Sequence, residues 1–143
     1  MPSDFALKAM NSIHRLALGV SGGRLGWNAL GMQVLELTTI GRRSGRPRLT
    51  LLTAPMRVGD AYVVVASRGG DDRHPSWLHN LRDEPRVAVA MNGGVPVRMT
   101  ARIATPEERA QLWPQITANH PNYARYQRRT NREIPLVLLK PLS

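Results

Sequence analysis

The sequence predicts a mainly β protein with flanking helices, in which an antiparallel sheet of about six strands closes into a small barrel. Two observations lead to this fold class. Apolar and polar residues alternate with a period of two in several segments after residue 31, and turn sequences join neighbouring segments without a crossover helix. A Rossmann fold is not expected, because no G-x-G-x-x-G motif opens a helix after the first strand.

The first element expected is a helix over residues 4–20, where apolar side chains recur at helical spacing. Gly22 and Gly23 end this helix and begin a flexible stretch. Residues 1–25 are therefore expected to precede the main domain, which spans residues 26–143. Two interpretations of the helix stay open: it packs on its own domain or a partner subunit, or it makes a weak peripheral contact with a membrane surface.

Six segments carry the strand pattern, and two of the turns between them are hairpin signals. Gly59-Asp60 separates two apolar runs, and Asn92-Gly93-Gly94 separates two more. Each turn is expected to join antiparallel neighbours, and Pro96 indicates that the strand after the second turn starts at a sheet edge. The expected strands are residues 32–40, 48–58, 61–67, 86–91, 95–104 and 134–140.

Three further helices are expected, and one has a clear start signal. Thr105 stands at the cap, Pro106 at the first helical position and Glu108 at the third, which satisfies free amides at the helix start. This helix is expected to reach about residue 118, with a kink at Pro114. The other two helices are expected over residues 75–82 and 122–130.

The charge balance points to an anionic partner. The chain of 143 residues has 20 Lys and Arg against 10 Asp and Glu, a net charge of +10, so its surface attracts nucleic acid, acidic lipid or a phosphorylated cofactor. Absence of Cys excludes disulfides, thiol catalysis and thiolate metal sites. No apolar run is long enough to span a bilayer and the first residues do not form a signal peptide, so a cytoplasmic protein is expected.

Two runs of arginine stand out. Residues 41–48 (G-R-R-S-G-R-P-R) place four cations and no acid in a loop between two strands, and glycines there allow backbone amides to join the side chains around an anion. This pattern favours an anion site over a merely solvated loop. Arg125, Arg128, Arg129 and Arg132 recur at helical spacing, and for them an anion contact and a solvated helix face remain equally open.

A third constellation follows a strand. Ser67-Arg68-Gly69-Gly70 comes before a helix in which Trp77, Asn80 and Leu81 share one face. Packing on the barrel explains Trp77 and Leu81 well, whereas Ser67, Arg68 and Asn80 are polar groups of the kind that orient a ligand. The four histidines lack metal-ligand spacing, so surface or capping roles are expected for them and no metal site is expected.

Four segments together resemble the deazaflavin-dependent nitroreductase family. They are L-T-T-I-G-R-R-S-G-R-P-R at residues 37–48, V-A-S-R-G-G at 65–70, P-S-W-L-H-N-L at 75–81 and H-P-N-Y-A-R-Y at 120–126, in the same order from about residue 30 to the end. The resemblance implies a split, flavin-reductase-like β-barrel that binds reduced coenzyme F420, whose phosphate and poly-glutamate tail are anionic.

The resemblance also assigns site residues. Arg42, Arg43, Ser44 and Arg48 would hold the phosphate and tail. The flat ring would be lined by Thr50, Leu51, Leu52 and Thr53 and approached by Ala66, Ser67 and Arg68, with Gly69, Gly70, Ser76, Trp77 and Asn80 completing the pocket.

By the same resemblance, the enzyme would transfer a hydride from reduced F420 to an electron-poor small molecule, namely a quinone, an enone or a nitro compound. Tyr123 and Tyr126 resemble the family's substrate-side tyrosines, so Ser67, Tyr123 and Tyr126 are the candidate catalytic residues, with Tyr126 or Ser67 as proton donor. Thr53 and His120 stand where nitroimidazole-reducing members have Tyr, which argues against nitroimidazole as substrate.

Two alternatives belong to other classes. An FMN-binding split barrel would also grip a phosphate with Arg, although the density of Arg in residues 42–48 fits a longer polyanion better. A non-catalytic nucleic-acid-binding module would use the net charge, but only 5% of residues are aromatic and no strand interleaves aromatic with basic residues, so specific nucleic-acid binding is not expected. A monomer and a homodimer both remain open.

Overall fold

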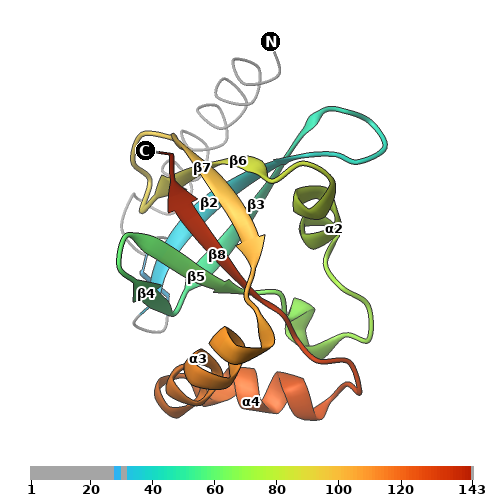
Figure 1. The fold of residues 1–143 in the computed structure, drawn as a ribbon, viewed down its shortest axis with the longest axis vertical. Helices are drawn as coiled ribbons and strands as arrows, with labels where there is room; N and C mark the ends of the chain where they lie inside the picture. Colours follow the sequence, from blue (N-terminus) through green and yellow to red (C-terminus); the bar gives the residue numbers. More distant parts are fainter. Residues whose placement is uncertain (1–27, 30–31, 143) are drawn as a thin grey trace.

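The computed structural model describes residues 28–29 and 32–142 (Figure 1). The predicted helix at residues 4–20 and its linker to residue 25 lie outside them. The elements in chain order are β1 (Asn28–Ala29), β2 (Met32–Ile40), β3 (Pro47–Ala54), β4 (Met56–Val58), β5 (Ala61–Val65), the 3₁₀ turn η2 (Arg68–Gly70), α2 (Ser76–Asp83), β6 (Arg86–Met91), β7 (Val97–Ile103), α3 (Pro106–Asn119), α4 (Pro121–Arg128) and β8 (Leu136–Pro141).

The described strands form a single antiparallel sheet that curls into a barrel, as predicted. Hydrogen-bonded neighbours follow the order β1-β2-β6-β7-β8-β5-β4, and β3 pairs with the other side of β2. Because β3 runs into β4 through Pro55 alone, the circuit from β2 back to β2 is closed by the chain itself. The single strand predicted over residues 48–58 is therefore wrong in detail: it is split at Pro55, which has no amide to donate to a ladder.

Both predicted hairpins are present. Val58 pairs with Ala61 across the first turn, and Val89 pairs with Val97 across the second. The expectation for Pro96 is wrong, because β7 begins only after this proline and lies between β6 and β8. Pro96 is compatible with an interior strand because it stands outside the ladder.

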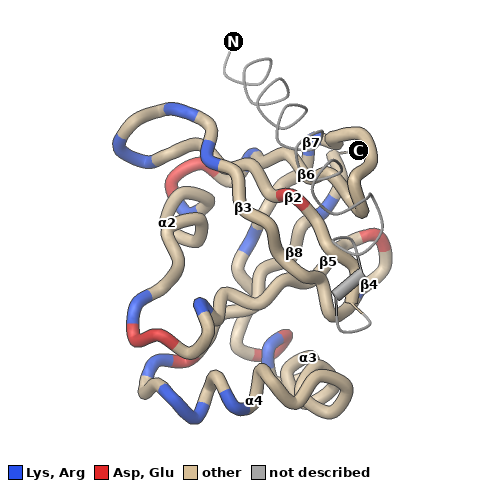
Figure 2. The backbone as a smooth tube through the Cα atoms, turned by 180° about the vertical axis from the view of Figure 1, so that it is seen from behind, with Lys and Arg blue, Asp and Glu red and all other residues tan. Residues whose placement is uncertain are grey.

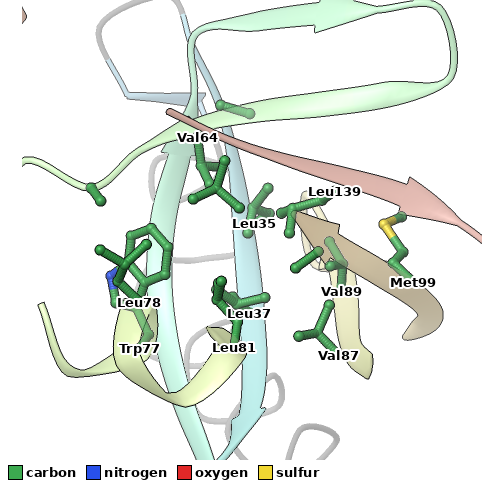
Figure 3. Close-up of a cluster of buried hydrophobic side chains, with 14 residues drawn as sticks. Leu35, Leu37, Val64, Trp77, Leu78, Leu81, Val87, Val89, Met99 and Leu139 are labelled. Atoms are coloured by element: carbon green, nitrogen blue, oxygen red, sulfur yellow. The ribbon is translucent and has the colours of Figure 1, made fainter. Parts of the chain in front are cut away.

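One hydrophobic cluster fills the barrel interior. Alternate residues of the strands point inward, among them Leu35, Leu37 and Val64, all fully buried. Trp77, Leu78 and Leu81 of α2 join the same cluster, and Figure 3 shows them facing Leu37. α2 is thus more than an outer layer, because its apolar face closes the interior.

A second cluster lies on the outer face of β5 and β8. Val63, Leu136 and Leu138 pack there against Ile116 of α3 and Tyr123 of α4, among others. The opposite faces of β5 and β8 contribute to the interior cluster, so both strands are buried on both sides. α4 is thereby held against the sheet close to the end of β5.

The start of α3 confirms the capping prediction. Thr105 Oγ1 accepts a hydrogen bond from Glu108 N at 3.2 Å, and Glu108 Oε1 accepts one from Thr105 N at 2.9 Å. The helix continues through Pro114 to Asn119.

Basic residues are numerous in the β2–β3 turn, near α2 and along α4, and others lie on β6, β7 and β8. Figure 2 shows blue segments on the turn between β2 and β3, near α2 and along α4, with red segments close to both ends of α2. In the part of the chain that the structure describes, no helix has the length and apolarity required to cross a membrane.

Candidate functional site

The arginine-rich turn between β2 and β3 is built to present cations. Gly41 N donates to Arg46 O at 2.8 Å and Gly45 N donates to Gly41 O at 2.8 Å, so the turn has a defined shape. Arg42, Arg43 and Arg48 are exposed, and none of them pairs with a carboxylate of residues 32–142. Most of their donors are thus left for an external anion, which is what a phosphate or a chain of carboxylates requires.

Asn80 of α2 fixes this turn to the barrel. Its Nδ2 donates to Thr39 Oγ1 at 3.1 Å, and its Oδ1 accepts from Arg42 N at 3.1 Å and Arg42 Nη1 at 3.3 Å. Asn80 is buried, and both its amide oxygen and its amide nitrogen bond to other parts of the protein. Asn80 thus supports the arginine-rich turn, and Thr39 is a partner that spacing in the sequence does not reveal.

The two other α2 residues named from the sequence are placed differently from each other. Trp77 is only 6% exposed and belongs to the barrel interior, which agrees with the packing explanation. Ser76 is exposed at the first residue of α2. Of the predicted α2 set, Ser76 is therefore the residue whose side chain a ligand can reach directly.

The four β3 residues expected to line the ring, Thr50, Leu51, Leu52 and Thr53, do not share one face. Leu52 pairs with Leu35 and Thr50 with Leu37, so these two lie on the interior side, while Leu51 and Thr53 alternate to the other side. What they share is the second edge of β3, which pairs with no strand in the described ranges. Backbone donors and acceptors are open along that edge.

The turn after β5 has an unusual backbone. Arg68, Gly69 and Gly70 have φ of 47°, 64° and 87°, three consecutive residues in the left-handed region. A Cβ on Gly70 would lie 2.7 Å from Tyr126 O and 3.0 Å from Arg129 Cβ. The sequence predicts close approach of a ligand to this glycine pair, and the structure shows close approach of α4 to Gly70.

The residues before this turn differ in what they offer. Ala66 is fully buried in the interior cluster, and its backbone N and O bond to Pro135 O at 2.9 Å and Arg132 Nη1 at 3.2 Å, so the structure does not present it to a ligand. The Ser67 side chain is largely buried, yet its hydroxyl makes no hydrogen bond within the described part of the chain. Arg68 is exposed and lies 3.9 Å from Asp71.

The two tyrosines of α4 have different environments. Tyr123 is buried, its hydroxyl lies 2.9 Å from Thr53 Oγ1, and it donates to Met32 Sδ at 3.5 Å. Burial raises the pKa of Tyr123, and the hydrogen bond with Thr53 opposes that shift. Tyr126 packs edge to face on Tyr123 with 6.0 Å between ring centroids, and its hydroxyl makes no hydrogen bond in residues 28–29 and 32–142. Of the candidate proton donors, Ser67 and Tyr126 therefore have uncommitted hydroxyls.

The arginine run at residues 125–132 separates into two groups. Arg125 and Arg128 are exposed on α4, as a solvated helix face requires. α4 ends at Arg128, so the expected helical spacing does not extend to Arg132, which is half-buried and donates Nη2 to Ser67 O at 2.7 Å. The contact joins residues 65 positions apart, so no local signal in the sequence reveals it.

His74 was expected to have a surface or capping role, but it lies beside Arg132. Its Nδ1 is 3.0 Å from Arg132 Nη1. Burial, followed by the neighbouring charges of Arg132, Arg82 and His79, lowers the pKa of His74. Among the described residues, no group of three His, Asp or Glu could hold a metal ion.

Comparison with known proteins gives one family. The family model described as F420H(2)-dependent quinone reductase matches residues 12–141. An F420H(2)-dependent quinone reductase of Mycobacterium tuberculosis is 42% identical over 123 residues, covering 83% of this chain and 81% of that protein.

Two solved structures agree with this match. An F420-H2 dependent reductase (FDR-A) superposes with a TM-score of 0.63 at 35% identity, covering 75% of this chain and 93% of that one. A domain-swapped dimer superposes with a TM-score of 0.68 at 33% identity, covering 98% of this chain and 100% of that one.

Proposed function

Because the chain belongs to the F420H(2)-dependent quinone reductase family, and is thereby an oxidoreductase that uses reduced coenzyme F420, we propose that it reduces a quinone at the site described above. This site consists of the arginine-rich turn at residues 41–46 with Arg48, the open edge of β3, the turn Ser67–Gly70 and Tyr126. The observation that carries the proposal is an exposed set of arginines at the start of β3 that pair with no carboxylate of residues 32–142.

The coenzyme fits the residues present. Its phosphate and poly-glutamate tail are anions, and Arg42, Arg43, Ser44 and Arg48 would hold them with charge-assisted hydrogen bonds. The edge of β3 would offer backbone groups to the ring, and Ser76 and Arg68 are exposed. When bound, reduced F420 supplies a hydride.

Reduction of a quinone to a hydroquinone takes up one hydride and one proton. Ser67 and Tyr126 are the groups that offer a hydroxyl proton to the quinone oxygen, because neither hydroxyl is engaged elsewhere in the described chain. Tyr123 is a poor donor for this step, since its hydroxyl is tied to Thr53 and Met32. We assign Tyr123 to support of the Tyr126 ring.

A two-part experiment tests this function. The full chain is titrated with F420 and, in parallel, with FMN, following fluorescence at two salt concentrations. Reduced F420 is then mixed with a soluble naphthoquinone under nitrogen, following the absorbance of oxidised F420. Saturable, salt-sensitive F420 binding and protein-dependent oxidation are expected. Tight FMN binding would instead indicate a flavin-binding split barrel. If neither F420 nor FMN binds, the nucleic-acid-binding alternative becomes the one to test.

Assembly is a finer part of the proposal. We propose a homodimer, supported by the domain-swapped dimer that covers 98% of this chain at 33% identity. Light scattering at several protein concentrations tests it, and a monomer mass at all of them would contradict it. The membrane contact expected of residues 4–20 stays a prediction, which sedimentation with anionic vesicles tests.

A further inference from the structure

The Arg132 side chain donates three hydrogen bonds to backbone carbonyls of the turn that carries Ser67. Arg132 Nη1 donates to Ala66 O at 3.2 Å, Nη2 donates to Ser67 O at 2.7 Å, and Nε donates to Asp71 O at 2.8 Å. These carbonyls stand at the two ends of the turn, so one guanidinium fixes both ends against each other. Three acceptors at fixed angles suit the planar fork of Arg, which the single ammonium of Lys cannot reproduce.

His74 completes the surroundings of this guanidinium. A guanidinium has only donors, so the contact of Arg132 Nη1 with His74 Nδ1 at 3.0 Å requires an unprotonated Nδ1. No carboxylate lies within ion-pair distance of Arg132 in the described part of the chain. The positive charge is therefore stabilised by carbonyl dipoles of the turn, and removal of Arg132 leaves those carbonyls without their donor.

The segment that carries Arg132 is anchored on its other side to α3 and α4. Gln127 Nε2 of α4 donates to Arg132 O at 2.7 Å, and Gln127 Oε1 accepts from Ile134 N at 2.9 Å. Arg109 of α3 donates to Gln127 Oε1 at 3.1 Å and to Ile134 O at 2.9 Å. Arg132 thus projects from a segment that α3 and α4 hold in place.

The same turn also touches the helix that carries Tyr126. Gly70 packs against Tyr126 O, and Arg129 Nη1 donates to Gly69 O at 3.2 Å. The turn is therefore held at its ends by Arg132 and along its glycines by α4. This arrangement fixes the backbone of Ser67 relative to the backbone of Tyr126.

We propose that Arg132 is a positioning residue of the reductase, which sets the Ser67 hydroxyl relative to Tyr126 by holding both ends of the turn. The inference rests on the proposed function, in which these hydroxyls face the quinone. A shift of about 1 Å in a reacting group lowers rates by up to roughly 100-fold, so the hydrogen bonds of Arg132 affect turnover without contact to the quinone.

Arg132→Lys and Arg132→Ala test the proposal, with Arg125→Ala as the matched control because Arg125 is an exposed cation of the neighbouring helix. The first readout is hydrogen exchange of amides 66–74 in the protein without coenzyme. The second is kcat and KM for a soluble naphthoquinone, with the dissociation constant of F420 measured separately. The third is rescue of Arg132→Ala by millimolar guanidinium, compared with sodium at equal ionic strength.

In both Arg132 variants we expect faster exchange at 66–74 and a kcat lowered by about 10- to 100-fold, with KM nearly unchanged. Guanidinium should restore part of the lost kcat in Arg132→Ala, a result that a general loss of folded protein would not give. If Arg132→Ala does not fold, the Lys variant carries the test.

Three results would overturn the proposal: unchanged kcat in both variants, faster exchange without loss of kcat, or loss of kcat with unchanged exchange. The exchange data are independent of the proposed function. If the wild-type protein does not reduce quinones, the function fails while the exchange data still report whether Arg132 holds the turn.

Discussion

The two turns of the site use arginine in opposite ways. In the turn between β2 and β3 the guanidinium groups are exposed, and a single buried amide, Asn80, ties the turn to the barrel. In the turn after β5 the guanidinium of Arg132 is half-buried and bonds backbone carbonyls. In the described chain the first turn leaves most of its guanidinium donors without a partner, whereas the second turn uses them for its own shape, so equal local charge does not imply an equal role.

The largest effect is expected where the second turn meets α4. Gly70→Ala would place a Cβ 2.7 Å from Tyr126 O, at a backbone φ of +87°. We expect a loss of unfolding free energy of about 3 kcal/mol, measured by denaturant titration. Gly69→Ala is the matched control, because nothing lies within 4 Å of its Cβ position and only the conformational cost of about 1 kcal/mol applies. Equal losses in both variants would show that the contact with α4 contributes nothing.

The first turn should respond in binding and leave stability unchanged. Arg43→Ala and Arg48→Ala are each expected to weaken F420 binding by about 1–3 kcal/mol, because each removes a charge-assisted contact to the anionic tail. Neither change should lower the denaturation midpoint, since neither side chain has an ion-pair partner in the described chain. Fluorescence titration of the variants beside Arg125→Ala checks this, and unchanged dissociation constants would remove the turn from the site.

The two tyrosines of α4 allow the same comparison between a hydroxyl without a hydrogen bond in the described chain, that of Tyr126, and one that is hydrogen-bonded, that of Tyr123. Tyr126→Phe is expected to lower kcat by about tenfold, roughly 1.4 kcal/mol, with little change in F420 binding. Tyr123→Phe is expected to lower stability by about 1 kcal/mol through the lost contact with Thr53, with kcat less affected. Steady-state kinetics and unfolding curves of both variants test this assignment. A large loss of kcat in Tyr123→Phe with little loss in Tyr126→Phe would make Tyr123 the proton donor.

The smallest effect is a pH dependence confined to the second turn. The pKa of His74 is lowered by burial and then by Arg132, Arg82 and His79, so the neutral form is favoured in the folded protein. A lowered pKa in the folded protein means that neutral His74 contributes to stability at pH values above the ordinary histidine pKa of about 6.5. That stability is lost as the pH falls through the pKa of His74 in the folded protein. Below that pH, hydrogen exchange of amides 66–74 should become faster, because the free energy of opening this segment falls by less than about 1 kcal/mol.

In His74→Gln the side-chain carbonyl accepts from Arg132 at every pH, so the pH dependence of exchange at 66–74 should disappear. Exchange that stays equally pH-dependent in this variant would assign the titration to another group.

Signals that lie within a few residues of each other predicted the structure well. The capping residues Thr105 and Glu108 and the two hairpin turns are local, so their geometry follows from backbone hydrogen bonding whatever the rest of the chain does. The interruption at Pro55 was missed because the apolar pattern continues across it.

The supports of the site could not be predicted from the sequence. Asn80 and Arg42 are 38 residues apart, Arg132 and Ser67 are 65 apart, and Tyr123 and Thr53 are 70 apart. Each pair meets only because the fold brings α2, α4 or the segment after α4 to a particular strand end. Sequence patterns indicated residue types suited to ligands, whereas tertiary packing decides which polar groups remain free.

Pro55 has a consequence for how the protein responds to its ligands. β3 pairs with β2 and β4 pairs with β5, but the chain bends between them, so within the described residues the barrel wall has a seam that no strand ladder crosses. A ligand that lies along β3 replaces the missing neighbour strand and couples the two sides of the seam. Thermal melting should therefore report occupancy, with the midpoint rising as ligand concentration exceeds the dissociation constant.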